Sequence, residues 1–379
     1  MAPRCMAPLF ILSAIALLIT DWHQNKRLPR PDKTLLTILG GVIGYGLISY
    51  FWSINQPDTL TKVGQMIGTF GMVPFVAPIL ARLETKDFYR LGQLWLVGLG
   101  LGTAIYLSEW WNGFELYDLT HPGNNDPVDS KQNKAIVLLS LWLVMAAPYL
   151  FVTAQKNMRL IFLGLMALIG YGSSVSHSAT AELLFLALPI LALIVWKLPA
   201  RFTMTLALIG TVGLTTLMPF IAVGIYNHTN WQHTETINRS LKSRVEIWNQ
   251  ASSRAFEKPI FGWGLDASPN LPNRGETSVL FDFPMDIHHL HPHNGPIQIW
   301  FELGAIGVAA FCALFVTLYR RMKTLPEAAQ KYATFGASGI FLYTLSIWGI
   351  WQSWFMASLC FAGLMVYAGA KFLQNKTAA

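Results

Sequence analysis

A polar segment late in the chain holds the side chains best suited to proton transfer. The string HHLHPHN at positions 288–294 places four of the chain's nine histidines within six residues, directly before an apolar run. Histidine is the side chain whose ordinary pKa suits a general base near neutral pH. A metal site would need convergent ligands, and no HExxH or cysteine pattern accompanies the segment. We favour a general base over a metal site or a polar membrane-border loop without chemistry.

His293 is the member of this segment that the following residues are best placed to hold. Asn294 is suited to be the N-cap of the next helix, and Pro296 falls in the first turn, where a helix tolerates proline. His293 is then expected at the positive end of that helix. A positive dipole and nearby arginines favour the neutral imidazole, which is the form that a base must have.

Arg244 is the second candidate, as a cation for a phosphate group. The string SRVE at 243–246 has the form of a capping box and predicts a short amphipathic helix that stops at Lys258-Pro259. A positive side chain in its first turn is disfavoured by the helix dipole, so a bound anion would explain Arg244, and diphosphate suits an arginine fork. The alternative is a surface arginine paired with Glu246 or Asp266.

Carboxylates also fall inside the apolar runs. Glu302 lies one helical turn after Gln298, and Glu182 lies within another run. Charge inside a membrane is costly, so these residues indicate either a function or pairing between helices.

The elements that must position these side chains are membrane helices. The 379-residue chain is 53% hydrophobic and 12% charged, which is more apolar surface than a soluble core can bury. Its apolar residues form runs long enough to cross a hydrocarbon core. About eleven such runs centre on residues 9–20, 35–52, 63–81, 91–110, 135–154, 158–174, 179–196, 202–226, 296–319, 333–350 and 354–371. The predicted fold is therefore an all-α polytopic transmembrane bundle.

The basic residues fall mostly in every second short loop, as the positive-inside rule predicts for cytoplasmic loops, so the net charge of +7 does not indicate nucleic acid. The long loop from Asn227 to His293 is then periplasmic, and loops of that length usually carry function. We divide the chain into a bundle (1–226), a large periplasmic loop with short helices and the active site (227–294), and C-terminal transmembrane helices (295–379). This alternation puts the N-terminus outside, and a twelfth span upstream of Met1 would explain it.

Two motifs resemble a known family. His293-Asn294, nine residues, Gly304, two residues and Gly307 resemble the signature of the O-antigen ligases. The string RVEIW at 244–248, followed by PIFGWG at 259–264, is similar to the shared core of the wider ligase and polymerase superfamily.

The resemblance implies a multi-pass protein of the bacterial inner membrane with its active site on the periplasmic side. It implies undecaprenyl-diphosphate-linked O-antigen as the donor and the lipid A-core oligosaccharide as the acceptor, with inner-membrane lipids around both. Such enzymes are metal-independent and inverting and use no cofactor. By the motif match, His293 is the base and Arg244 binds the diphosphate.

One departure from the family pattern concerns the second diphosphate-binding cation. Superfamily members commonly carry an arginine in a Ser-Arg-Gly-Ala-like string, whereas here the corresponding stretch is SHSA at 176–179. The cation must then come from elsewhere, although each candidate also suits a plain interfacial charge. The candidate substrate-binding residues are Asn294, Arg239, Lys242, Lys134 and His177.

Three other functions stay open. An O-antigen polymerase would use the same donor, and a protein O-oligosaccharyltransferase belongs to the same superfamily; the glycine spacing after His293-Asn294 favours a ligase. A transporter or flippase for lipid-linked sugars would carry out no chemistry. The large loop argues against it, because a transporter keeps its polar groups near the bilayer midplane.

Overall fold

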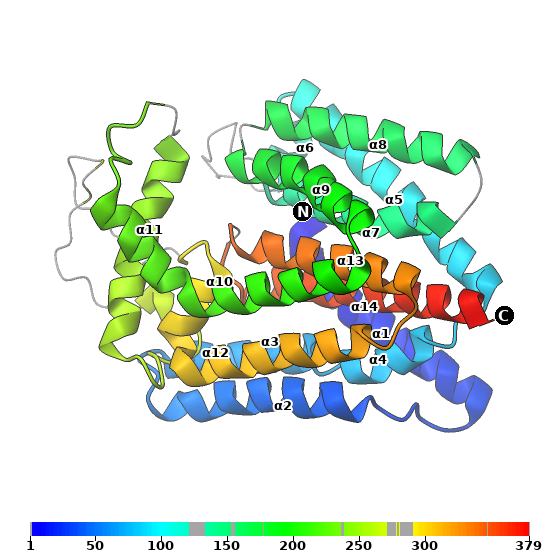
Figure 1. The fold of residues 1–379 in the computed structure, drawn as a ribbon, viewed down its shortest axis with the longest axis horizontal. Helices are drawn as coiled ribbons and strands as arrows, with labels where there is room; N and C mark the ends of the chain where they lie inside the picture. Colours follow the sequence, from blue (N-terminus) through cyan, green and yellow to red (C-terminus); the bar gives the residue numbers. More distant parts are fainter. Residues whose placement is uncertain are drawn as a thin grey trace.

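The structure is a computed structural model that describes residues 2–120, 133–152, 156–176, 178–235, 239–270, 278, 280, 291–346 and 348–378. The described residues form helices and connecting segments, with no strand among them. Figure 1 shows most of the helices running side by side along one axis, as in a membrane bundle. The all-α polytopic fold predicted from the sequence is confirmed.

The helices of the first half are α1 (Ala2–Asn25), α2 (Lys33–Ile48), η1 (Ser49–Phe51), α3 (Gln56–Thr69), α4 (Val73–Leu80), α5 (Thr85–Trp111), α6 (Glu115–Thr120), α7 (Asn133–Val152) and α8 (Lys156–Val175). Those of the second half are α9 (Ala179–Lys197), α10 (Ala200–His228), α11 (Arg239–Glu257), η2 (Ser268–Asn270), α12 (Gly295–Met322), α13 (Glu327–Thr344) and α14 (Ser353–Ala378).

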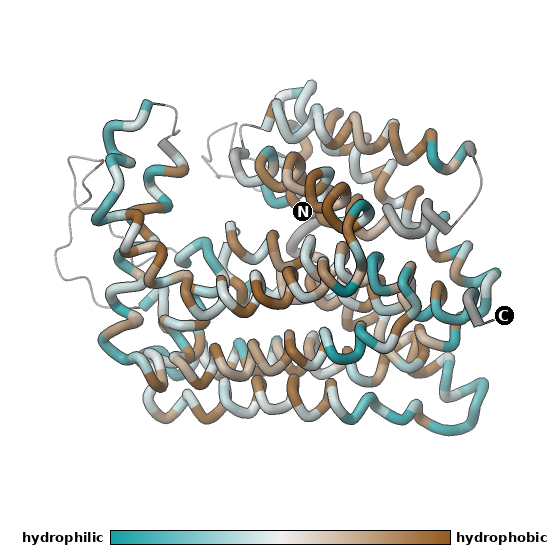
Figure 2. The backbone as a smooth tube through the Cα atoms, in the orientation of Figure 1, coloured by the Kyte–Doolittle hydropathy of each residue, from teal (hydrophilic) through white to brown (hydrophobic). Residues whose placement is uncertain are grey.

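Nine segments among the described residues are long and apolar enough to cross a membrane. They are α1, α2 with η1, α3 with α4, α5, α8, α9, α10, α12 and α14, which match nine of the predicted runs. The other two predicted runs, 135–154 and 333–350, overlap α7 and α13, although α13 ends six residues before the predicted run does. Figure 2 shows apolar residues along the middle of the bundle and polar residues toward its ends.

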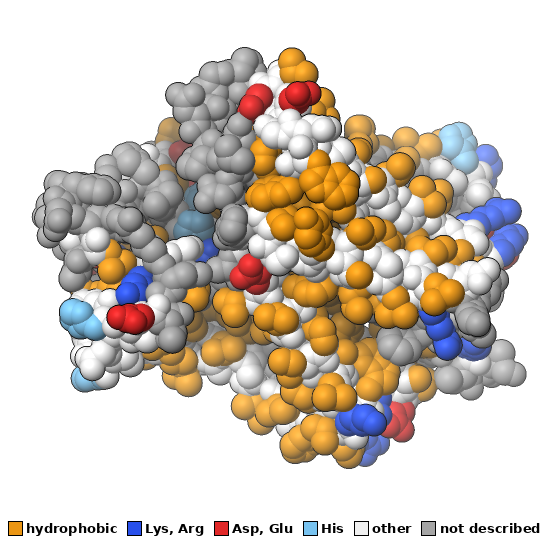
Figure 3. All heavy atoms as spheres, turned by 90° about the horizontal axis from the view of Figure 1, so that it is seen from above, with side chains coloured by type: hydrophobic (Ala, Val, Ile, Leu, Met, Phe, Trp, Pro, Cys, Tyr) orange, Lys and Arg blue, Asp and Glu red, His pale blue; other side chains and the backbone are white. Residues whose placement is uncertain are grey.

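The two ends of the bundle differ in charge. Figure 3 shows the lysine and arginine side chains gathered mostly at the end opposite α11. At this basic end Asp32 caps α2, accepting from the backbone N–H of Leu35 at 3.1 Å, and Arg321 of α12 donates to the same carboxylate at 2.8 Å. Arg82 similarly donates to Asp21 at 2.9 Å. The candidate site therefore lies at the end away from the basic loops.

α14 is the most enclosed of the candidate spans. In its apolar window 61% of the residues are buried inside the protein, against 22% for α10. It packs against α1, α3, α4, α7 and α13. The connection between α13 and α14 leads into this enclosed helix, and it therefore lies near the centre of the bundle, at the same end as α11.

α12 is broken at Gly304, which has φ +61° and ψ −163°. Pro259–Gly264 crosses the helix at this break and supplies the missing backbone partners. The N–H groups of Trp263 and Gly264 donate to the carbonyls of Phe301 and Glu302 at 3.0 and 2.9 Å. In return the N–H of Ala305 donates to the carbonyl of Pro259 at 2.8 Å. The two glycine-containing motifs are thus one structural unit.

Candidate functional site

His293 lies at the start of α12, in a backbone conformation that favours glycine. Its φ is +53°, in the left-handed region, and such strain in a non-glycine residue is concentrated at functional sites. The next residue holds it there. The Asn294 side chain accepts from the backbone N–H of Ile297 at 3.1 Å and donates through Nδ2 to the carbonyl of Leu345 at 3.0 Å. The predicted N-cap role of Asn294, with Pro296 in the first turn, is confirmed.

His293 is a neutral imidazole at physiological pH. Burial, the charge of Arg244 and that of His291, in this order, lower the pKa of His293 to about 4. The predicted neutral form is therefore the one present, although burial rather than the helix dipole is the largest cause. His291 is also neutral, because burial and the charges of Lys62 and Lys134 lower its pKa to about 4.

Arg244 faces the site from α11, but the predicted helix start was wrong. α11 begins at Arg239, so Ser243 lies inside the helix and is no N-cap, and Arg244 is in the second turn. The sequence pattern of a capping box is short, and residues 239–242 extend the helix by one turn without breaking its periodicity. The dipole argument for a bound anion at Arg244 therefore does not apply, and its case depends on its surroundings.

Those surroundings are buried and polar. Arg244 donates through Nη1 to the carbonyl of Ser346 at 3.3 Å and also to the Ser346 hydroxyl. Burial lowers the pKa of the guanidinium. The expected alternative partners are engaged elsewhere: Asp266 pairs with Lys62 at 3.5 Å, and Glu246 accepts from the Ser278 hydroxyl at 2.7 Å.

The apolar face of α11 fixes Arg244 relative to His293. Trp248 and Ala251 pack against the cluster that contains Ile297, and Ala255 packs against Phe301. This confirms the predicted amphipathic helix, which ends at Glu257 before Lys258-Pro259 as expected. In these pairs the residue numbers rise together, so α11 and the first part of α12 run in the same direction, and Arg244 falls opposite His293.

The remaining predicted residues have different positions. Lys134 lies with its amine 5.8 Å from the ring centroids of Trp348 and Trp354, and its charge acts on His291. Lys242 donates to the carbonyl of Gln232 at 2.7 Å. The side chain of Arg239, together with His177, His288 and His289, lies outside the described residues. The structure thus brings Arg244, Asn294 and His293 together, with Lys134 behind His291.

Glu302 has a structural role. Its carboxylate accepts from Gln298 Nε2 at 2.9 Å, from the backbone N–H of Asp266 at 2.7 Å and from Trp351 Nε1 at 2.5 Å, and also from the Ser268 hydroxyl. The carboxylate therefore joins α12 to residues 266–268, which follow the Pro259–Gly264 loop, and to Trp351, which lies just before α14. Of the two interpretations of this carboxylate, pairing between elements is the one that the contacts support.

The sequence analysis missed Leu345 and Ser346, which contact Asn294 and Arg244. It placed both inside the apolar run 333–350, whereas α13 ends at Thr344, and residues 345, 346 and 348–352 form turns and irregular backbone. The serine, the glycine and the glutamine in this stretch are the only sequence signal of that ending, and the surrounding tryptophans and isoleucines mask it in a hydropathy average.

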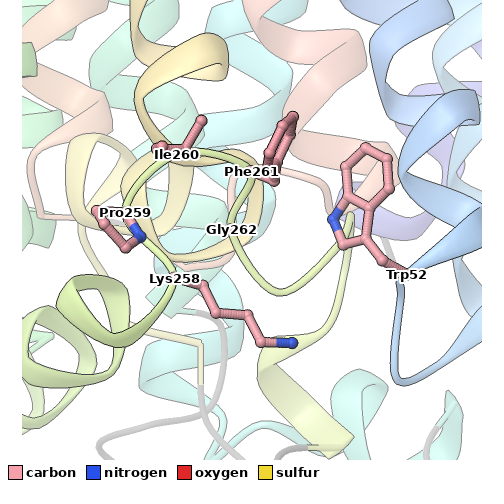
Figure 4. Close-up of a pocket in the computed structure, with 6 residues that line it drawn as sticks. All are labelled: Trp52, Lys258, Pro259, Ile260, Phe261 and Gly262. Carbon is pink, nitrogen blue, oxygen red and sulfur yellow. The ribbon is translucent and has the colours of Figure 1, made fainter.

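An open pocket of about 560 Å³ lies beside the break in α12 and is lined by Trp52, Lys258, Pro259, Ile260, Phe261 and Gly262. Figure 4 shows the side chains of Trp52 and Lys258 on either side of the loop. Ile260 and Phe261 are more than half exposed, as suits side chains that face lipid. Trp263 instead packs inward: Lys258 lies 4.0 Å from its ring centroid, and its indole N–H donates to the carbonyl of Arg254 at 2.9 Å.

Comparison with known proteins finds sequence relatives of this chain. Residues 164–312 match the family model described as O-Antigen ligase. The chain is 26% identical over 319 residues to a Rickettsia conorii protein provisionally named polysaccharide ligase, covering 80% of this chain and 72% of that protein. A Rickettsia bellii protein of the same name is 26% identical over 324 residues, or 83% of this chain and 75% of the relative.

A relative from Salmonella typhimurium named O-antigen ligase is 25% identical over 339 residues, or 82% of this chain and 76% of the relative. No solved structure matches the chain. The matched domain contains α9, α10, α11 and the first part of α12, with Arg244 and His293, and the relatives match over most of the chain. The chain therefore contains an O-antigen ligase domain within a polytopic membrane protein, and most of its length is similar to proteins named as polysaccharide or O-antigen ligases.

Proposed function

We propose that this protein is an O-antigen ligase, which transfers undecaprenyl-diphosphate-linked O-antigen polysaccharide to the lipid A-core oligosaccharide. The observation that carries the proposal is that Asn294, which directly follows the neutral His293, and the buried Arg244 both donate to one dipeptide, Leu345-Ser346. A transfer from a sugar diphosphate needs a base on one side of the reacting carbon and a cation on the other. His293 and Arg244 are suited to these two roles.

The reaction is a single displacement at the anomeric carbon of the donor sugar. The acceptor hydroxyl oxygen forms the new C–O bond while the bond from carbon to the diphosphate oxygen breaks, and its electron pair leaves with the diphosphate. The hydroxyl proton passes to the neutral imidazole of His293. Arg244 stabilises the negative charge that grows on the leaving group, as a guanidinium in a partly dry site does most effectively. One displacement inverts the configuration of the sugar, and the arginine supplies the positive charge without a metal.

The same proposal places the site on the periplasmic side of the bacterial inner membrane. The basic end of the bundle would face the cytoplasm by the positive-inside rule, and α11 with His293 lies at the opposite end. Both substrates are lipid-anchored, so each would enter from the bilayer. The functional division is then a transmembrane part (1–226), the active-site loop (227–294) and C-terminal helices (295–379), with the connection after α13 completing the site.

The name of the Salmonella typhimurium relative supports a ligase rather than a polymerase. The site geometry alone does not separate the two, because both would bind the same donor. What separates them is the acceptor, which is a core oligosaccharide for a ligase and a second lipid-linked chain for a polymerase.

The test is ligation by the purified protein in lipid nanodiscs, with lipid-linked polysaccharide and core acceptor. We compare the unaltered protein with His293→Ala and Arg244→Ala, and with the matched controls His233→Ala and Arg201→Ala, whose side chains are exposed. Loss of a base typically lowers a rate by about a hundred-fold to ten-thousand-fold. We expect that loss for His293→Ala, a comparable loss for Arg244→Ala, and normal product with both controls.

Normal ligation by His293→Ala would remove the proposed site. Longer lipid-linked chains, without any transfer to the core acceptor, would identify a polymerase instead.

A further inference from the structure

The connection between α13 and α14 contacts most of the candidate site. Four of its residues, Leu345, Ser346, Trp348 and Gly349, each touch a different candidate side chain. The first three contact Asn294, Arg244 and Lys134 as described above. Gly349 is packed so closely on His291 that a Cβ there would lie 2.5 Å from the imidazole ring. This connection lies outside the matched family domain, which ends at residue 312.

Ser346 is the member of the connection that holds the cation. Its carbonyl oxygen and its hydroxyl both accept from Nη1 of Arg244. It is itself held from the other side by Thr180 of α9, whose hydroxyl donates to the Ser346 carbonyl at 3.2 Å and lies 3.4 Å from the Ser346 hydroxyl. Thr180 is buried. Three elements, α9, α11 and the connection, therefore meet at this serine.

The geometry leaves Arg244 available for an anion. Both Ser346 contacts use Nη1, so the Nη2 and Nε sides of the planar guanidinium have no partner in the described part of the chain. No carboxylate pairs with Arg244 within that same part. A neutral serine thus fixes the direction of the guanidinium without neutralising its charge, which an acidic partner would do.

The neighbouring residue fixes the other half of the site. Leu345 accepts from the side chain of Asn294, which caps α12 directly after His293. The carbonyls of two consecutive residues therefore hold the cation and the residue that anchors the base. Consecutive Cα atoms are separated by about 3.8 Å across a trans peptide, so this spacing allows little relative movement.

We propose that Ser346 is a positioning residue of the transfer reaction, which keeps Arg244 aimed at the leaving diphosphate at a fixed separation from His293. The inference rests on the proposed ligase function. It adds a residue outside the matched domain to the machinery of the reaction. Ser346 acts through Arg244 and does not itself contact the reacting atoms.

The experiment compares Ser346→Ala with Ser346→Thr, which keeps the hydroxyl, and with Ser358→Ala. Ser358 is a matched control, because it is a buried serine that donates only within its own helix, to the carbonyl of Trp354 at 2.7 Å. Loss of a hydrogen bond to a charged group corresponds to about a tenfold effect. We expect kcat for ligation to fall about tenfold in Ser346→Ala with an unchanged acceptor KM, and to recover in Ser346→Thr.

A second measurement separates positioning from a general loss of structure. Arg244 is the group whose charge lowers the pKa of His293 at neutral pH, where His291 is itself uncharged. If Ser346→Ala lets Arg244 move away, the pKa of His293 rises and the acid limb of the pH–rate profile shifts to higher pH. In an Arg244→Lys background, which lacks the guanidinium, Ser346→Ala should add no further loss, since interacting residues are not additive.

Each outcome has a defined meaning. Normal kcat in Ser346→Ala, an equal loss in Ser358→Ala, or full additivity with Arg244→Lys would overturn the positioning role and leave the ligase function intact. If the unaltered protein gives no ligated product, the proposed function fails, and the positioning role fails with it.

Discussion

Replacing Gly304 with alanine should destabilise the protein without touching the candidate catalytic residues. The glycine has φ +61° and ψ −163°, a combination that is essentially restricted to glycine. A Cβ at this position would lie 2.4 Å from the carbonyl oxygen of Ile260 and 2.7 Å from the backbone nitrogen of Gly262. Both contacts are with backbone, so the loop Pro259–Gly264 would have to move away from α12.

The magnitude follows from two contributions. The backbone strain costs about 1–3 kcal/mol. Displacement of the loop weakens the hydrogen bonds across the break, which are those donated by Trp263, Gly264 and Ala305, at about 1 kcal/mol each. We expect a total of about 4–6 kcal/mol, which for a chain of this size lowers Tm by about 5–10 °C.

Thermal unfolding in detergent, followed by intrinsic tryptophan fluorescence, measures this change. Gly98→Ala is the matched control, because Gly98 lies in α5 with no atom within 4 Å of its virtual Cβ. That substitution should leave Tm unchanged or raise it slightly, since alanine favours helix by about 0.5–1 kcal/mol. A Tm for Gly304→Ala equal to that of the unaltered protein would refute the argument that the break needs glycine.

Two further predictions concern charge. The pKa of His293 is about 4, and a base acts in its deprotonated form. The value of kcat/KM for ligation should therefore be level around neutral pH and fall to half near pH 4. A half-maximal value near pH 6.5 would contradict the burial of His293. At the opposite end, Arg321 lowers the pKa of Asp32, so this pair stabilises the fold above the ordinary carboxyl pKa and loses its effect as the pH falls through the lowered value. Asp32→Ala removes both the N-cap of α2 and the ion pair with Arg321, and should cost about 1–2 kcal/mol of folding stability at pH 7. Asp32→Asn keeps the N-cap and should cost less. Thermal unfolding measures both variants, and equal Tm values would contradict the capping role.

Local chemistry made part of the site predictable from sequence. A short polar side chain directly before Gly-Pro is typical of an N-cap, and Asn294 does cap α12. The end of α11 at Glu257 likewise follows from Lys258-Pro259, because proline does not continue a helix. The neutral state of His293 was predicted correctly, but from the helix dipole, whereas burial is the larger cause. Burial depends on tertiary packing, which a single sequence does not report.

Other features depended on contacts between segments far apart in the chain. The capping-box pattern placed the first residue of α11 at Arg244, five residues too late, because a four-residue pattern also occurs inside helices. Ser346 was hidden in an apolar run, and its importance arises only where α9, α11 and the α13–α14 connection meet. No spacing rule relates residues 180, 244 and 346.

The family motifs acquire a physical meaning in this structure. From Asn294 to Gly304 the first part of α12 advances ten residues, or about 15 Å, and from Arg244 to Glu257 α11 advances about 20 Å. The two segments run in the same direction toward the break, where the Pro259–Gly264 loop is hydrogen-bonded to α12 on both sides of Gly304. That bonding fixes the register of α11 against α12, and the two lengths then bring Arg244 opposite His293. The glycine eleven residues after His293 is therefore a requirement of geometry: it sets where Arg244 of a distant motif meets His293, the proposed base, although the glycine itself lies outside the proposed chemistry.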